Sequence, residues 1–257
     1  MAYHFIGIKG TGMAALASIL YDEHKEVTGS DIEKYIFTQD EVEKRGIPIT
    51  TFDASHIHDH DTCIIGLSFD ETNPEVKAAM QNPTVKTYYY NEYLGKLLES
   101  YTSISVAGTH GKSTTTGILG HVLPQLLPTG YLIGDGHGHM PEDAKYFVLE
   151  SCEFQRHFLA YHPDYALITN IELDHVDYYK DMDDYLDAFQ SFVNQTKKHC
   201  VIFGDDPYLP KLSYSVPVTT YGLQKGNDYQ AVNIEQGPFG MHFDCLYQGK
   251  VLAHIEL

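Results

Sequence analysis

Residues 103–116 read SISVAGTHGKSTTT, a β-branched apolar run that leads into two glycines, a lysine and a cluster of hydroxyl residues. An apolar helical pattern follows, and this order is typical of a phosphate-binding loop between a strand and a helix. Gly108 and Gly111 let the backbone curl so that N–H groups point at an anion, beside the positive end of the helix dipole. In such a loop Lys112 reaches the β and γ phosphates and the Ser113 hydroxyl binds Mg²⁺. The segment therefore predicts polyphosphate chemistry.

The loop departs from the strict phosphate-loop pattern at one position. That pattern has a glycine five residues before Gly111, where this chain has Val106. We therefore interpret the loop as a shortened variant. A glycine turn that carries an exposed lysine remains the alternative interpretation of these residues.

A second glycine-rich turn lies near the start of the chain. Residues 3–8 read as a buried strand, Gly10, Thr11 and Gly12 follow it, and an apolar helix is expected next. About twenty residues further on, a second strand ends at Asp31, where Rossmann-type units place an acid on a ribose. The spacing G-x-x-G-x-G differs from the dinucleotide fingerprint G-x-G-x-x-G, so a tight turn without a ligand remains an open alternative.

Strands and helices alternate along the chain, which predicts an α/β fold with mostly parallel sheets. A complete βαβ set precedes Ser100 and a second set follows it, so we expect a Rossmann-like domain over residues 1–100 and a phosphate-loop domain over 101–257. Ligands bind at the carboxyl ends of parallel strands, where Ser68 would join the first turn. From Pro217 the pattern changes to strands and turns. Because the chain stops inside an apparent strand, we expect the second domain to be truncated.

Two further strand ends in the second half carry reactive groups. The apolar run 146–150 ends at Glu150, and the run 164–170 leads into His175. In a parallel sheet these ends lie on the same edge as Lys112 and Ser113. A hydroxyl, a carboxylate and an imidazole beside a triphosphate could complete a Mg²⁺ shell, although imidazole is an unusual ligand for this ion. Capping of the next helix is the alternative role for Glu150.

The overall charge limits the classes of partner. The chain has 17 Lys and Arg residues against 35 Asp and Glu, a formal charge of −18, which argues against a nucleic-acid surface or an anionic membrane. Only two arginines occur: we expect Arg45 on a solvated helix face, and Arg156, on a helix after Glu153, either packing or contacting substrate. No leader and no long apolar segment is evident, and the four scattered cysteines read as buried thiols. These features predict a cytoplasmic protein.

Two histidine clusters have spacings that suit Zn²⁺, namely His56, His58 and His60 and the pair at 137 and 139. Neither cluster has a convincing second pair of ligands. A solvated loop is the favoured interpretation of both.

Three motifs together are similar to those of the Mur ligases: FIGIKGTGM at residues 5–13, GTHGKSTTT at 108–116 and TNIELDH at 169–175. They occur in the family's order and extend over nearly the whole chain. The resemblance implies a Rossmann-like N-terminal domain for a UDP-sugar, followed by a central ATPase domain. A third, Rossmann-like domain follows these two in the family.

The resemblance also implies roles for single residues. The positions that match the UDP-sugar site are Gly10, Thr11, Gly12, Asp31 and Ser68. The positions that match the ATP loop are Gly108, Thr109, His110, Gly111, Lys112, Ser113 and Thr114. Glu150 and His175 match metal ligands, to which the loop pattern adds Ser113, and Lys112, Glu150 and His175 form the expected catalytic set. Glu153 matches a second acid that is often present in this branch, and the resemblance assigns it no role.

The implied reaction is ATP-dependent amide-bond formation in peptidoglycan biosynthesis, with Mg²⁺ as cofactor. The branch of the family that the chain most resembles joins L-alanine to the lactyl carboxylate of UDP-N-acetylmuramate through an acyl phosphate. Because no third domain follows Leu257, we expect binding of the UDP-sugar, weak binding of ATP and little or no ligase activity. A ligase that recycles murein tripeptide and a non-catalytic nucleotide-binding module remain alternatives, and a nicotinamide oxidoreductase is disfavoured by the broken fingerprint. The sequence contains no feature from which the oligomeric state can be predicted.

Overall fold

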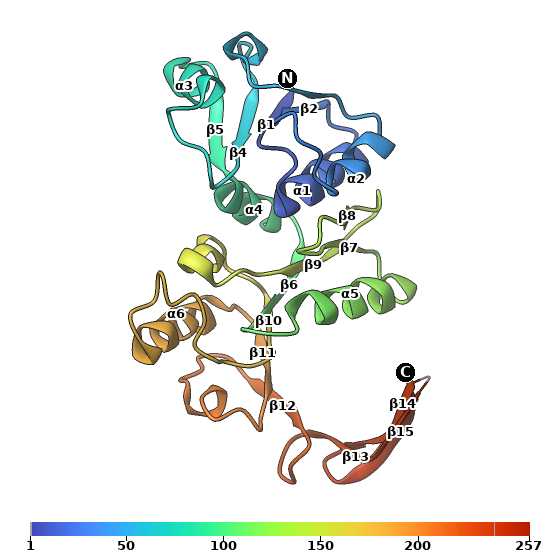
Figure 1. Ribbon diagram of the computed structural model, residues 1–257. Coiled ribbons are helices and arrows are strands. Elements are labelled where there is room, and N and C mark those ends of the chain that lie inside the picture. The colour runs from blue at the N-terminus through green and yellow to red at the C-terminus, as the bar shows by residue number, and fades with distance from the viewer. Residues whose placement is uncertain (1, 239) are drawn as a thin grey trace. The chain divides into compact units, whose positions relative to one another are not determined.

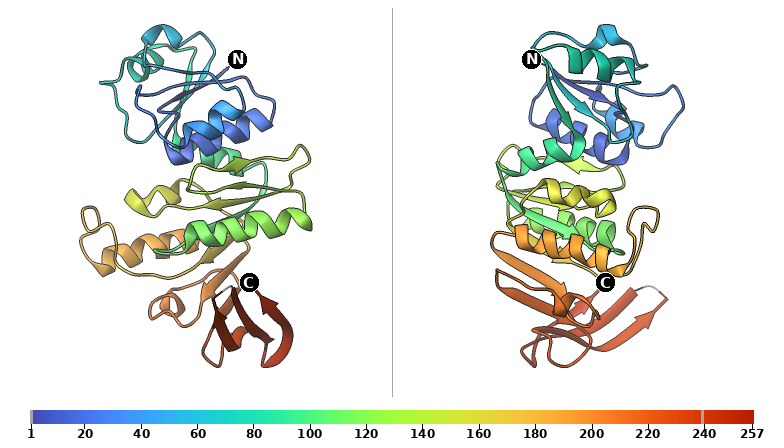
Figure 2. Two further views of the ribbon diagram at one scale, coloured as in Figure 1. Left: turned by 45° about the vertical axis from the view of Figure 1, so that its right-hand side comes forward. Right: turned by 90° about the vertical axis from the view of Figure 1, so that its left-hand side faces the viewer.

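The computed structural model describes residues 2–238 and 240–257 and confirms an α/β fold with mostly parallel strands (Figures 1 and 2). The chain divides into two compact units. The first comprises residues 1–104 and 113–150, and the second comprises residues 105–112 and 151–257. The predicted domain boundary near residue 100 differs from this division and remains a prediction.

The first unit contains a five-stranded parallel sheet with the order β3-β2-β1-β4-β5. Its strands are β1 (Tyr3–Ile6), β2 (Val27–Ser30), β3 (Ile49–Thr50), β4 (Thr62–Ile65) and β5 (Lys86–Tyr89). Its helices are α1 (Thr11–Asp22), α2 (Gln39–Lys44), the short 3₁₀ helix η1 (Ala54–His56), α3 (Pro74–Gln81) and α4 (Tyr90–Leu98). Helices α1 and α2 cover one face of the sheet and α3 covers the other (Figure 1). The strand order reverses between β1 and β4, which is where such sheets bind ligands.

Local sequence explains these elements. Residues 13–20 of α1 are all buried, as expected for a helix that packs against a sheet and against neighbouring elements. Helix α3 begins at Pro74 because the Asn73 side chain accepts hydrogen bonds from the N–H groups of Glu75 and Val76. None of the helices in the described part of the chain has the length and apolar character of a membrane span.

The first unit also contains β7 (Thr129–Leu132), β8 (Gly138–His139), β9 (Tyr146–Glu150), the 3₁₀ helix η2 (Leu123–Gln125) and all of α5 (Lys112–Val122) except its first residue. Strand β7 pairs with β9 in parallel and with β8 in antiparallel orientation. Helix α1 approaches β8 so closely that a Cβ on Gly138 would lie 2.2 Å from the Ala15 carbonyl oxygen. Glycine is therefore required there.

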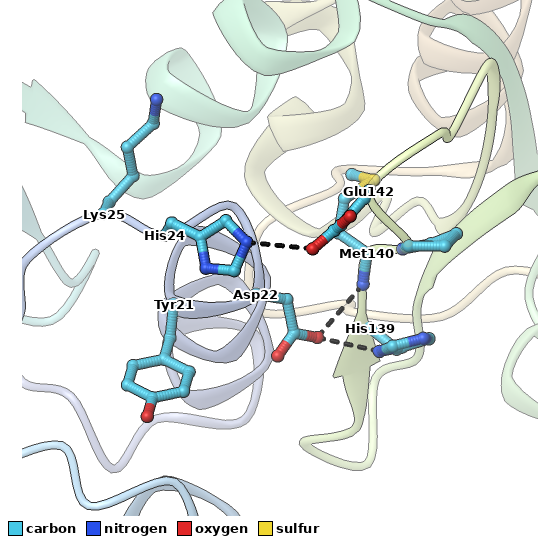
Figure 3. Close-up of a pocket in the computed structure, with 8 residues that line it drawn as sticks. Tyr21, Asp22, His24, Lys25, His139, Met140 and Glu142 are labelled. Atoms are coloured by element: carbon cyan, nitrogen blue, oxygen red, sulfur yellow. Dashed lines mark hydrogen bonds and ion pairs between the residues drawn. The ribbon is translucent and has the colours of Figure 1, made fainter.

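Arg45, at the end of α2, contacts both α1 and β8. The prediction that it lies on a solvated helix face is wrong, because its side chain is 19% exposed. Its Nε lies 3.2 Å from an Asp22 carboxylate oxygen, and its Nη2 donates to the Gly138 carbonyl. Asp22 also accepts hydrogen bonds from the His139 ring and the Met140 N–H, as Figure 3 shows. These groups border a cleft of about 640 Å³ that contains none of the predicted site residues; its lining is Tyr21, Asp22, His24, Lys25, His139, Met140, Pro141 and Glu142.

The second unit continues from β6 (Thr102–Ala107), within which the chain passes from one unit to the other. Strands β10 (Tyr165–Ile168), β11 (His199–Phe203) and β12 (Val218–Gly222) pair in parallel. Strands β13 (Tyr229–Gly237), β14 (Gly240–Tyr247) and β15 (Lys250–Glu256) extend this sheet, with β13 parallel to β12 and the last two pairings antiparallel. The strands expected after Pro217 are thus confirmed.

The remaining helices of the second unit are η3 (Phe154–Ala160), α6 (Met182–Gln195) and η4 (Leu209–Lys211). Helix α6 buries Tyr185, Ala188, Phe189, Phe192 and Val193, which is the spacing of one helix face. Phe158 stacks on Phe192 with ring centroids 4.7 Å apart. This aromatic core supports the segment that follows β9.

All four cysteines are free, but only Cys63 and Cys200 are fully buried. Cys152 is exposed and Cys245 is half-buried. The expectation of buried thiols is therefore correct for two of the four.

Candidate active site

The phosphate-loop segment forms the turn that its glycines predict. Strand β6 ends at Ala107, Gly108 and Gly111 have φ values of +129° and +81°, and α5 begins at Lys112. A Cβ on Gly108 would lie 2.1 Å from the Thr169 hydroxyl oxygen. Glycine thus lets the loop lie against the segment that follows β10.

Asn170 holds this loop through three hydrogen bonds. The Thr109 N–H donates to the Asn170 carbonyl, and the His110 N–H donates to the Asn170 side-chain oxygen, each at 3.0 Å. The Asn170 side-chain NH₂ donates to the His110 carbonyl at 2.9 Å. Because the amides of Thr109 and His110 already have acceptors, the donors left for an anion begin at Gly111 and continue into the first turn of α5.

Thr109 links the loop to α6. Its hydroxyl donates to the Glu172 carbonyl at 2.8 Å and accepts from the Glu172 N–H at 2.9 Å. The Tyr185 hydroxyl lies 2.9 Å away and must be the donor in that contact, because the threonine proton is already used. Burial raises the pKa of Tyr185, so its hydroxyl keeps the proton that this bond needs.

Lys112 lies between its own loop and a buried carboxylate. Its ammonium donates to the carbonyls of Gly108 and Thr109 at 2.6 and 3.0 Å and to Glu153 Oε1 at 3.1 Å. Glu153 Oε2 lies 3.0 Å from the same nitrogen. The Glu153 side chain is 1% exposed and that of Lys112 is 14% exposed, so this is a desolvated ion pair.

His175 completes this cluster. Its Nε2 lies 3.6 Å from Glu153 Oε1, and its ring packs against Phe154 with centroids 4.7 Å apart. Ligand atoms of Glu153, Asp174 and His175 all lie within 4.8 Å of one another, a spacing that one metal ion could bridge. The structure therefore brings Lys112 and His175 together through Glu153.

The turn after Glu153 differs from the predicted helix. Gln155 and Arg156 have φ values of +49° and +59°, a left-handed conformation that is unfavourable for residues with side chains. Arg156 is held by ion pairs to Asp184 at 2.7 Å and to Asp187 at 2.9 Å, both on helix α6. The Tyr179 hydroxyl donates to the Glu153 carbonyl. These contacts fix the backbone that aims the Glu153 carboxylate at Lys112.

Glu150 lies at the end of β9, and its carboxylate accepts a hydrogen bond from the Gly134 N–H at 2.8 Å. The donor in this bond is a loop amide, whereas the alternative prediction for Glu150 is a cap on the next helix. Glu150 and Ser113 belong to the first compact unit, whereas His175 belongs to the second. The expected metal set of Ser113, Glu150 and His175 therefore stays a prediction.

A cleft of about 500 Å³ opens beside the loop in the second unit. Its lining is His110, Asn170, Ile171, Glu172, Met182, Asp206, Pro207 and Tyr208. Apolar and hydrogen-bonding groups are combined in this lining, as is common in small-molecule clefts.

The predicted UDP-sugar residues lie at the carboxyl ends of β1, β2 and β4. Gly10 precedes α1 without a side-chain cap, so the first amides of that helix remain available to an anion. Asp31 is 5% exposed and uses its two oxygens to accept the N–H groups of Lys9 and Ile32, both at 2.7 Å. Ser68 is exposed in the turn after β4. In this structure Asp31 thus braces the turn.

Lys9 is buried in the same turn. Its ammonium donates to the carbonyls of Ile32 and Lys34 at 2.8 and 3.0 Å. No sequence pattern predicts this role, because both acceptors are backbone groups more than twenty residues away.

His56 binds a carboxylate within the first unit. Its Nδ1 lies 2.9 Å from Glu75 Oε1, and the His4 ring lies 3.4 Å from Glu75 Oε2. Neither the cluster at residues 56–60 nor that at 137–139 is among the potential metal sites of the described residues.

Sequence reasoning singled out Glu153 but gave it no role, and it did not identify Thr169 or Tyr185. The short spacing between Glu150 and Glu153 is a signal for a second acid near the site. No sequence pattern marks the contacts of Thr169 and Tyr185, because they depend on tertiary packing.

Comparison with known proteins gives consistent results. A family model described as the Mur ligase middle domain matches residues 106–257, and one described as the Mur ligase family, catalytic domain, matches residues 2–102. UDP-N-acetylmuramate–L-alanine ligases of Lactiplantibacillus plantarum and Levilactobacillus brevis are 48% and 49% identical over 99% of this chain. The chain spans 58% and 57% of the length of these two relatives.

Two solved structures resemble the whole chain. The UDP-N-acetylmuramate-alanine ligase of Thermotoga maritima has a TM-score of 0.83 at 26% identity, covering 100% of this chain and 60% of that one. A UDP-N-acetylmuramate:L-alanyl-γ-D-glutamyl-meso-diaminopimelate ligase from Neisseria meningitides has a TM-score of 0.84 at 26% identity, covering 99% of this chain and 86% of that one.

Proposed function

The chain belongs to the Mur ligase family, and from this we propose that it serves an ATP-dependent ligase that joins L-alanine to the lactyl carboxylate of UDP-N-acetylmuramate. The observation that carries the proposal is the 48–49% identity to L-alanine ligases over 99% of the chain. The phosphate loop with its buried lysine–acid pair supports it. The reaction would be a cytoplasmic step of peptidoglycan biosynthesis.

In this proposal the second unit binds ATP. The base occupies the cleft beside His110 and Tyr208, and the phosphates lie on the amides that begin at Gly111. Lys112 places its charge on the β and γ phosphates. The UDP-sugar binds at the first glycine turn, where the amides of α1 receive its diphosphate.

The reaction has two steps. The lactyl carboxylate attacks the γ-phosphorus, ADP leaves, and an acyl phosphate forms. The amine of L-alanine then attacks the acyl carbon, inorganic phosphate leaves, and the amine loses a proton as the amide forms. Little covalent work falls to the protein, so positioning and charge neutralisation dominate, and Lys112 is the chief contributor from this chain.

The donor groups of the site suit a divalent cation. Glu153 Oε2 is buried and accepts no hydrogen bond within the described residues, and carboxylate oxygens are ligands that Mg²⁺ prefers. Ser113, Glu150 and His175 are the residues that we propose to hold Mg²⁺. When bound, the ion would neutralise charge on the phosphates.

The test uses the protein that carries this chain, supplied with ATP, UDP-N-acetylmuramate and L-alanine. We expect phosphate release and the UDP-N-acetylmuramoyl-alanine product, detected by mass spectrometry, only when all three substrates are present. Phosphate release that does not depend on alanine contradicts the ligase proposal. Calorimetry of the chain itself should show binding of UDP-N-acetylmuramate.

A tripeptide ligase is the second candidate, because the Neisseria enzyme has a TM-score of 0.84 and is covered over 86% of its length. The sequence identity of 26% to that protein, against 48–49% to the L-alanine ligases, favours L-alanine. An assay in which L-alanyl-γ-D-glutamyl-meso-diaminopimelate replaces L-alanine decides between them. Faster turnover with the tripeptide would reverse the assignment.

A further inference from the structure

Glu153 is a buried carboxylate whose hydrogen-bonding capacity is only partly used. Both of its oxygens lie close to the Lys112 ammonium, at 3.1 Å for Oε1 and 3.0 Å for Oε2. Only Oε1 receives a well-directed hydrogen bond; Oε2 is fully buried and accepts none from residues 2–238 or 240–257. An ionised carboxylate in this position depends on one cation for its charge balance.

Lys112 cannot serve both this carboxylate and a polyphosphate without rearranging. An ammonium group has three N–H donors, and those of Lys112 are directed at Gly108, Thr109 and Glu153. The first two acceptors are carbonyls of the loop itself and remain beside the lysine when it turns. The carboxylate of Glu153 is the acceptor that an anionic phosphate oxygen would replace, because both carry a negative charge.

Removal of Lys112 would leave the Glu153 carboxylate buried without a counter-charge, which is strongly unfavourable. Asp174 and His175 provide ligand atoms that lie, with those of Glu153, within 4.8 Å of one another. Two carboxylates and an imidazole form a donor set for a divalent cation. Glu153 Oε2, which pairs with Lys112 but accepts no well-directed hydrogen bond within the described residues, is available to that set once Lys112 moves away.

We propose that Glu153 exchanges cations: it pairs with Lys112 in the nucleotide-free protein and, when a polyphosphate draws Lys112 away, binds a divalent cation together with Asp174 and His175. The proposal rests on the proposed function in that ATP is the polyphosphate. It assigns Glu153 and Asp174 roles that the metal set of Ser113, Glu150 and His175 does not contain. Lysine and metal then compete for one carboxylate, so nucleotide binding tightens metal binding.

The competition can be tested without any nucleotide. Mn²⁺ is a paramagnetic substitute for Mg²⁺, and its binding is followed by electron paramagnetic resonance in the wild-type chain and in Lys112→Met. We expect Lys112→Met to bind Mn²⁺ at least about tenfold more tightly, because a positive charge about 3 Å from the ligand oxygens has been removed. In the double variant Lys112→Met/Glu153→Gln this gain should disappear.

Matched controls separate the proposal from general electrostatics. Asp177→Asn in the Lys112→Met background removes an exposed acid from the same loop and should leave the gain intact. Lys112→Gln replaces Lys112→Met if thermal melting shows that the latter is unfolded. Equal Mn²⁺ affinity in wild type and Lys112→Met overturns the proposal, as does a gain that survives Glu153→Gln. Neither outcome bears on the ligase assay, and failure of that assay leaves the Mn²⁺ result standing.

Discussion

The two glycine turns, residues 7–12 after β1 and 108–112 after β6, each contain a lysine near a buried acid, but they use these groups differently. In the first turn Lys9 donates to backbone carbonyls and Asp31 accepts backbone amides, so both charges brace the chain. In the second, Lys112 donates to two loop carbonyls but also to the Glu153 carboxylate, and side chains of Asn170 and Thr109 provide further bonds that hold the loop. The first arrangement is a fixed structure, whereas the second keeps a charge pair that a ligand can rearrange.

The largest expected effect comes from removing each lysine charge. Lys112→Met should lower kcat for amide formation by about 10³-fold or more, because a charge that stabilises the transferring phosphoryl group is lost. The matched variant Lys9→Met should leave kcat within about threefold and lower the free energy of unfolding by about 1–3 kcal/mol, because the carbonyls of Ile32 and Lys34 lose a donor. Steady-state kinetics and urea unfolding measure both. Similar kcat losses in the two variants would show that Lys9 and Lys112 do not differ in their contribution to catalysis.

Glycine substitutions in the second turn test how tightly it is braced. Gly108→Ala places a Cβ 2.1 Å from the Thr169 hydroxyl and 3.0 Å from the Thr169 nitrogen, so the loop must shift. A Cβ on Gly111 would have no atom of the described residues within 4 Å apart from its chain neighbours, so the cost there is the strain of φ +81°, about 1–3 kcal/mol. We expect Gly108→Ala to be the more destabilising in urea unfolding and to abolish nucleotide binding in calorimetry. If Gly111→Ala is the worse of the two, the contact with Thr169 does not hold the loop.

Asp31→Asn tests the bracing of the first turn. An amide side chain retains one acceptor oxygen, so one of the N–H groups of Lys9 and Ile32 loses its partner, at a cost of about 1–3 kcal/mol. The affinity for UDP-N-acetylmuramate should fall while the affinity for ATP stays unchanged, as measured by calorimetry. An equal loss of affinity for both ligands would show that the two turns are not independent.

The smallest expected effect is on how the free energy of unfolding falls at acid pH, which we attribute in part to Glu75 in the first unit. Burial acts to raise the pKa of Glu75, but hydrogen bonds from His4, Ser30, Asp53 and His56 outweigh it and hold this pKa below its ordinary value. A depressed pKa contributes stability above the unfolded-state value of about 4.3, and this is lost as the pH falls through the folded-state value. Urea unfolding between pH 7 and pH 3 should therefore show a flatter acid decline for Glu75→Gln than for wild type.

The exposed neighbour Glu71 provides the control for that experiment. Glu71→Gln should follow the wild-type pH dependence. A decline as steep in Glu75→Gln as in wild type would mean that other carboxylates control acid stability.

Much of the fold could be predicted because its signals are local. An apolar run marked strand β9 at its observed bounds, and the glycines with Lys112 marked the loop. The pairing of Lys112 with Glu153 could not be predicted, because it depends on two consecutive residues that adopt a left-handed conformation although neither is a glycine. Where helical spacing suggested a helix after Glu153, the ion pairs of Arg156 stabilise a different backbone.

That left-handed pair, Gln155 and Arg156, has a consequence for protein engineering. Each such residue costs about 1–3 kcal/mol, and the ion pairs of Arg156 help to offset it. The substitution Gln155→Gly would remove part of this cost and leave the Glu153 side chain unchanged. The melting temperature could therefore be raised by substitution in this turn, because the left-handed backbone that orients Glu153 lowers the stability of the fold.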